Sequence, residues 1–120
     1  MERRRGTLAD SFRFAAAGLA HLVRSQRNAR IEVGIGAVAV AAGAWLGLTA
    51  VEWAVLALTI ALVLILEGMN TALELAVDLA SPEANPRAKA AKDLSAGMVL
   101  LAALASVAVG AALFVPRLLR

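Results

Sequence analysis

The sequence lacks cysteine and tyrosine, contains a single histidine (His21), and is only 4% aromatic. Without cysteine the chain forms no disulfide and offers no thiolate, which leaves its redox compartment undetermined. A single histidine argues against a histidine-based metal cluster and against a Ser-His-Asp triad within one chain. Few aromatic rings are available to stack on bases, so we expect no nucleic-acid partner although the net charge is +3.

Charge is also scarce. Only 18% of the residues are charged, 61% are hydrophobic, and the mean hydropathy is +0.77. The apolar residues are concentrated in long uncharged runs at 33–51, 53–66 and 94–115. The runs at 33–51 and 94–115 are long enough to cross a bilayer, and the run at 53–66 is expected to continue as helix to about residue 80 and so to cross it as well. The sequence therefore predicts a single-domain, all-α integral membrane protein with transmembrane helices over about 31–50, 53–80 and 87–115.

Residues 7–27 predict an amphipathic helix that lies on the membrane surface. Apolar residues recur at helical spacing from Leu8 to Val23, and arginines occupy the other side. A polar hinge over residues 26–32 then leads into the first span. No signal-peptide core follows the basic N-terminus at the usual distance, so we expect no cleaved segment.

The basic residues predict the orientation of the chain in the membrane. Seven of the twelve Lys and Arg precede the first span, three lie in the second loop, two follow the last span, and none lies in the first loop. Because positive charge is retained on the cytoplasmic side, we expect a multi-pass protein of the cytoplasmic (inner) membrane with its N-terminus in the cytoplasm. Within the first span, Gly43 and Gly47 form a GxxxG pair that allows close helix approach.

A polar stripe interrupts the second span. Glu67, Asn70, Glu74 and Asp78 fall within roughly 80° of one another around a helix. Ionisable groups beside an apolar segment are costly and usually line a site or a pathway. The alternative is that these side chains only form hydrogen bonds with a neighbouring helix. Three carboxylates on one helix face favour function over packing alone.

The residues available for chemistry suit phosphoryl transfer. Neither a GxxxxGK[ST] loop nor a GxGxxG motif is present, so a nucleotide would be held in another way. Carboxylates can bind a divalent cation and Lys92 can bind phosphates, while positioning and charge neutralisation do most of the rest. Glu74 suits Mg²⁺, which prefers a few carboxylate oxygens and retained waters. Glu67, at the apolar end of the stripe, suits a general base.

The stretch Glu67-Gly-Met-Asn70-Thr-Ala-Leu-Glu74-Leu-Ala-Val-Asp78, followed after a proline-containing loop by Ala91-Lys92-Asp93, resembles the signature of the prokaryotic membrane diacylglycerol kinase and undecaprenol kinase family. The resemblance implies a homotrimer of three-span protomers with a surface helix and with sites shared between neighbours. It also implies that MgATP is used to phosphorylate a lipid hydroxyl. Glu67 would then be the catalytic base and Glu74 a metal ligand. The residues that would bind the nucleotide or shape its site are Asn70, Asp78, Glu83, Asn85, Lys92 and Asp93.

Two positions depart from the family pattern. Members commonly have a glutamate that supplies a second metal carboxylate where this chain has Gln26, whose uncharged amide oxygen would bind Mg²⁺ more weakly. Glu32 is not assigned to that role, because six positions along a helix place it roughly 120° away. Ala84 replaces a common aromatic residue, which puts nucleotide stacking there in doubt. The loop at 81–89 resembles the undecaprenol kinase branch, so undecaprenol is favoured over diacylglycerol as the acceptor.

Two other interpretations are left open. A small oligomeric channel or accessory protein would explain three short spans and a carboxylate stripe, but not why Lys92 and Asp93 accompany the stripe. A family member that has lost activity is suggested by Gln26. Transfer of phosphate from MgATP to a lipid separates the kinase from both.

Overall fold

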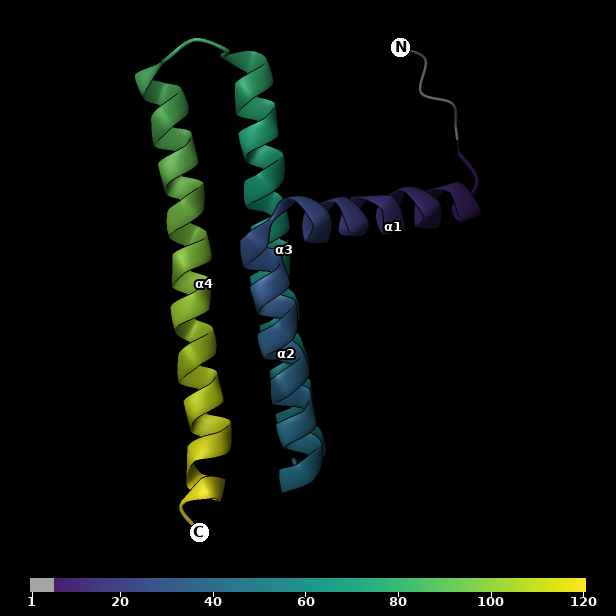
Figure 1. Cartoon of the computed structure of the whole chain (residues 1–120), viewed down its shortest axis with the longest axis vertical. Coiled ribbons are helices and arrows are strands. Elements are labelled where there is room, and N and C mark those ends of the chain that lie inside the picture. Colours follow the sequence, from purple (N-terminus) through teal and green to yellow (C-terminus); the bar gives the residue numbers. More distant parts are fainter. Residues whose placement is uncertain (1–5) are drawn as a thin grey trace.

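The computed structural model describes residues 6–120, and its regular elements are four helices: α1 (Leu8–Ser25), α2 (Arg27–Leu46), α3 (Ala50–Ala80) and α4 (Pro86–Leu118). Figure 1 shows α2, α3 and α4 running side by side along the long axis, while α1 projects sideways from them. Helices α2, α3 and α4 are each long and apolar enough to cross a membrane. The expected all-α membrane architecture, a first amphipathic helix followed by three apolar ones, is confirmed.

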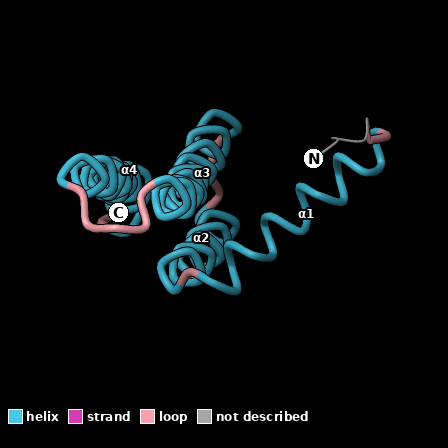
Figure 2. Tube along the Cα trace, turned by 90° about the horizontal axis from the view of Figure 1, so that it is seen from above, coloured by secondary structure: helices cyan, strands magenta, loops and turns pink. Residues whose placement is uncertain are grey.

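Helix α1 begins at a capping box. The Thr7 side chain accepts a hydrogen bond from the Asp10 backbone N–H, and the Asp10 carboxylate accepts one from the Thr7 N–H. Only Leu22 is buried in this helix. Viewed from above in Figure 2, α1 joins the cluster of the other three helices at its C-terminal end and extends away from it. Most of its apolar face is therefore left exposed, as expected for a helix at a membrane surface.

The corner between α1 and α2 is sharper than the sequence predicted. We expected a polar hinge over residues 26–32, but Gln26 alone lies outside both helices, with φ −115° and ψ 113°. The backbone N–H of Arg30 donates to the carbonyl of Gln26 over 3.3 Å, so the helical ladder of α2 already begins there. Polar residues 27–32 form the first turns of α2 because nothing in them, neither glycine nor proline, breaks a helix.

The glycine pair of the first span lies at the turn from α2 into α3, where Gly47 ends α2 and Gly43 lies against the turn and the start of α3. Gly47 adopts a left-handed conformation with φ 74° and ends α2, a position that glycine occupies without strain. Gly43 is buried, and a Cβ there would lie 2.7 Å from Leu48 Cδ1 and 3.0 Å from Trp53 Cη2. Gly43 thus lets the chain fold back tightly onto its own helix before α3 begins.

Helices α3 and α4 form the long antiparallel hairpin of the protein. At its α4 C-terminal end, Leu48, Leu56 and Leu113 make a small buried cluster. Beside it the Arg117 guanidinium donates to both carboxylate oxygens of Glu52. The third span was expected to end at about residue 115, but α4 continues through Pro116 to Leu118. The apolar outer faces of these helices stay exposed and are available to lipid or to other protein chains.

Candidate functional site

The polar stripe is built by one continuous helix, α3, as the sequence predicted. Glu67 is only 4% exposed and Thr71 only 7% exposed, and they are the two buried polar residues of this helix. The Thr71 hydroxyl donates to the carbonyl of Glu67 over 3.0 Å. The Glu67 carboxylate is therefore held within the helix bundle, where bulk water does not screen it, and the backbone carbonyl of Glu67 is hydrogen-bonded to Thr71.

Asn70 and Glu74 are oriented toward each other one turn further along α3. The Asn70 amide nitrogen lies 3.5 Å from Glu74 Oε1, a long hydrogen bond. The other end of the amide, Asn70 Oδ1, is buried and accepts no hydrogen bond within the described part of the chain. Buried acceptors are nearly always satisfied, so this oxygen marks a place for a further ligand, cation or water.

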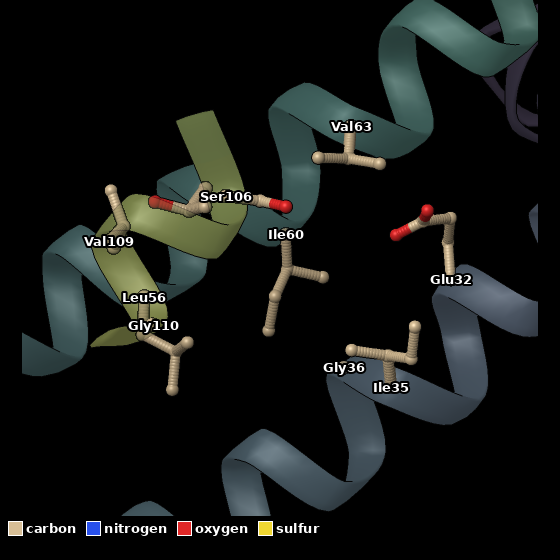
Figure 3. Close-up of a pocket in the computed structure, with 10 residues that line it drawn as sticks. Glu32, Ile35, Gly36, Leu56, Ile60, Val63, Ser106, Val109 and Gly110 are labelled. Carbon is tan, nitrogen blue, oxygen red and sulfur yellow. The ribbon is translucent and has the colours of Figure 1, made fainter. Parts of the chain in front are cut away.

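Glu32 lies close to this site, although the sequence assigned it no role there. In Figure 3 its carboxylate points from α2 toward Val63 and Ile60 of α3, at the edge of a cavity of about 70 Å³. Val63 lines the same cavity and lies one helical turn before Glu67 on α3. The angle of Glu32 around the helix excludes it from the position of Gln26, but does not decide which residues of α3 it faces. The useful signal was its spacing from Gly36, one turn away, which is buried where α2 packs on α3.

A polar hollow of about 700 Å³ lies beyond the stripe, where α3 turns into α4. It is lined by four of the residues that the resemblance assigns to nucleotide binding, namely Asp78, Glu83, Asn85 and Lys92. The Lys92 ammonium donates to the Asp78 carboxylate over 2.5 Å and joins the two helices across the hollow. Asn85 caps α4, because its Oδ1 accepts from the Arg87 N–H at 2.8 Å.

The remaining predicted residues lie outside this hollow. Asn70 lies eight residues before Asp78, which is about 12 Å along a helix. Asp93 forms an ion pair with Lys89, a residue that lines the hollow. Gln26 is at the corner of α1 and α2, where its amide nitrogen lies 3.5 Å from the Ser25 hydroxyl. Within residues 6–120, no three acidic or histidine side chains converge closely enough to hold a metal ion.

A large apolar cavity adjoins the stripe on its other side. It has a volume of about 870 Å³ and lies between α1, the start of α2 and the middle of α3. Leu64, Gly68 and Thr71 line it from α3, and they neighbour Glu67 on the helix surface. On the α1 side, Leu22 Cδ2 lies 3.6 Å from where a Cβ of Gly68 would be. Glu67 is thus placed between an apolar cavity and a polar helix face.

Comparisons with known proteins identify the family of the chain. A family model described as prokaryotic diacylglycerol kinase matches residues 13–114. A diacylglycerol kinase of Synechocystis sp. is 50% identical over 110 residues, covering 91% of this chain and 63% of the relative. An undecaprenol kinase of Bacillus subtilis is 35% identical over 108 residues, covering 90% of this chain and 88% of the relative. The matched region contains α2 and α3 completely, with the acidic stripe and Lys92, and the chain belongs to the prokaryotic diacylglycerol kinase family.

Proposed function

We propose that the protein is a membrane lipid kinase, which transfers the γ-phosphate of ATP to the hydroxyl group of a lipid. The position of Glu67 carries this proposal. Its carboxylate is buried on α3. An apolar cavity of about 870 Å³ lies on one side of it, and the polar stripe continues on the other side to Asp78, which lines the hollow between α3 and α4. A lipid hydroxyl presented from the cavity and a nucleotide presented from the hollow would meet near this carboxylate.

In the proposed reaction Glu67 acts as the general base. Its carboxylate accepts the proton of the lipid hydroxyl as the hydroxyl oxygen forms a bond to the γ-phosphorus of ATP. The bond between the γ-phosphorus and the bridging oxygen breaks, and ADP leaves with that oxygen. A base positioned in this way contributes about 10²–10⁴ in rate, and positioning and charge neutralisation supply most of the remainder.

The chain's oxygen atoms suit Mg²⁺, which we propose as the cofactor. Mg²⁺ takes oxygen ligands, often one or two carboxylates together with substrate phosphates and waters. The unpartnered Asn70 Oδ1 beside the Glu74 carboxylate is such a donor set. When bound, Mg²⁺ would neutralise charge on the phosphate oxygens of the nucleotide. Gln26 is kept as a further, uncharged candidate ligand.

The hollow between α3 and α4 is the proposed place for the nucleotide phosphates. Lys92 is a cation that can exchange its bond to Asp78 for a bond to phosphate, since both partners are partly exposed. Asp78, Glu83, Asn85 and Asp93 would surround it. Asn70 lies between this group and Glu67 and would shape the site between nucleotide and acceptor.

The acceptor is proposed to be undecaprenol or diacylglycerol. The loop at 81–89 favours undecaprenol, whereas the relative with 50% identity is named a diacylglycerol kinase. The relative with 35% identity is named an undecaprenol kinase. Both lipids have a terminal hydroxyl and a long apolar chain, so the apolar cavity suits either of them. Offering both lipids in parallel distinguishes the two acceptors.

We further propose a homotrimer that has shared sites, in the cytoplasmic membrane. Exposed apolar residues along α3 and α4, such as Leu58 and Leu104, offer faces on which other protomers can pack. Among residues 6–120, no three acidic or histidine side chains converge, so a carboxylate of a neighbouring protomer would add to the oxygens that Glu74 and Asn70 offer. With α1 on the cytoplasmic surface, the hairpin end that contains Lys92 would lie in the cytoplasm with the nucleotide.

The test is phosphate transfer from MgATP by detergent-purified protein, with undecaprenol and diacylglycerol offered in parallel. Incorporation of labelled phosphate into either lipid supports the proposal, and the ratio of the two kcat/KM values identifies the preferred acceptor. Transfer to neither lipid, by protein that is folded and oligomeric on size-exclusion chromatography, overturns it. That result would favour the inactive family member or the channel-like assembly protein.

A further inference from the structure

The corner between α1 and α2 contains one unusual side-chain contact. Arg30 Nη1 lies 2.9 Å from the carbonyl oxygen of Val23 and 2.9 Å from that of Arg24, and donates to both. These two carbonyls belong to the last turn of α1, where a helix has no backbone partners of its own. A guanidinium at that end also meets the negative end of the helix dipole. Arg30, which belongs to α2, therefore caps α1.

Few other contacts determine the direction of α1. Gln26 is the single residue between the helices, and its side chain makes no capping hydrogen bond to α2. Leu22 is the only buried side chain of α1 and contacts α3 at Gly68. The rest of the helix projects away from the bundle (Figure 1). The angle of α1 is thus fixed by Leu22 at one point and by Arg30 at the corner.

The angle of α1 also determines the shape of the apolar cavity. One wall of that cavity is formed by α1, through Ala15, Gly18, Leu19 and Leu22, and the opposite wall by α3. Rotation about Gln26 would move Leu22 away from Gly68 and open the cavity beside Glu67. A loosely held wall would let an acceptor lipid bind in many orientations, few of which place its hydroxyl near the carboxylate.

We propose that Arg30 is a positioning residue for the lipid acceptor. It caps the end of α1, holds that helix against α3, and so keeps the cavity beside Glu67 in the shape that binds the acceptor. This inference rests on the proposed function, because it assigns the cavity to the lipid. Arg30 touches neither substrate in this role and acts through α1 alone.

The test compares Arg30→Gln with Arg30→Lys and with Arg24→Gln. Arg24→Gln is a matched control, because it removes one positive charge from the same corner while its side chain makes no hydrogen bond among residues 6–120. For Arg30→Gln we expect the KM for the lipid to rise by about fivefold or more, since each lost kcal/mol of binding is about a factor of five. The KM for MgATP should be unchanged. Arg30→Lys keeps a charged donor and should recover part of the lipid KM.

Two measurements keep the inference separate from the kinase proposal. Hydrogen–deuterium exchange should become faster over residues 20–26 in Arg30→Gln and not in Arg24→Gln. Retention of diacylglycerol or undecaprenol, measured by native mass spectrometry, should weaken in the same variant. If the wild type transfers no phosphate but Arg30→Gln still loses lipid, the kinase proposal fails and the positioning role stands. The role of Arg30 would be overturned if hydrogen–deuterium exchange did not change in Arg30→Gln. It would also be overturned if both the lipid KM and lipid retention stayed the same, or if the KM for the lipid and the KM for MgATP rose equally.

Discussion

The side-chain nitrogen of Asn70 lies 3.5 Å from Glu74 Oε1, while the side-chain oxygen of Asn70, Oδ1, is buried without a partner among the described residues. The two side chains lie one helical turn apart, so the amide that orients the carboxylate also presents a free oxygen beside it. The donor and the acceptor end of Asn70 therefore have separate roles, and substitutions that remove one or both of them can distinguish these roles.

Replacing Asn70 should raise the Mg²⁺ requirement. Asn70→Leu removes both the donor to Glu74 and the free oxygen, and we expect the half-saturating Mg²⁺ concentration to increase about tenfold or more, as when groups that orient a metal ligand are lost. Asn70→Asp keeps an oxygen and should be less impaired. Phosphate transfer as a function of Mg²⁺ at saturating ATP and lipid provides the measurement. Equal Mg²⁺ curves for Asn70→Leu and the wild type would show that the amide lies outside the metal site.

Glu67→Gln should remove most of the activity without unfolding the protein. The amide keeps the shape of the side chain but cannot accept the hydroxyl proton, so kcat should fall by about 10²–10⁴. MgATP binding and the elution volume on size-exclusion chromatography should match the wild type, which makes these the internal controls. A variant that retains nearly the wild-type rate would exclude Glu67 as the base.

If Gln26 is a metal ligand, Gln26→Glu should make the protein bind Mg²⁺ more tightly. A carboxylate at this corner adds a charged oxygen where the present amide offers an uncharged one, so the half-saturating Mg²⁺ concentration should fall severalfold. Gln26→Met, which has a similar length but no ligating oxygen, should shift it in the opposite direction. If neither variant moves the Mg²⁺ curve, Gln26 does not contact the metal.

Gly43→Ala should destabilise the fold at the α2–α3 turn. The new methyl group would lie 2.7 Å from Leu48 Cδ1 and 3.0 Å from Trp53 Cη2, and such overpacking typically costs about 1–3 kcal/mol. The matched control is Gly34→Ala in the same helix, where a Cβ meets no atom within 4 Å. Apparent thermal midpoints in detergent should fall for the first variant and not for the second. A midpoint unchanged by Gly43→Ala would mean that Leu48 and Trp53 move aside freely.

Much of the fold and part of the site followed from local patterns. The stripe that begins at Glu67 could be predicted because side chains on one helix are related by a fixed rotation. The roles of Gly47 and Glu32 could not be predicted from local patterns. A GxxxG spacing is compatible with a helix contact or with a turn, and only the fold-back of Leu48 toward Gly43 selects the turn. The proximity of Glu32 to Glu67 depends on how α2 packs on α3.

The number of helices, their apolar character and the acidic face of α3 could be predicted from the sequence, because hydrophobic periodicity and helical geometry are local properties. Three relationships depend on the tertiary structure: Lys92 bonds to Asp78, Glu32 faces Val63 and Ile60 of α3, and Arg30 caps α1 from the next helix. Each of these joins residues from different helices or from both sides of a corner. Their contact depends on crossing angles and on the register between helices, which many side chains set together and no local pattern specifies.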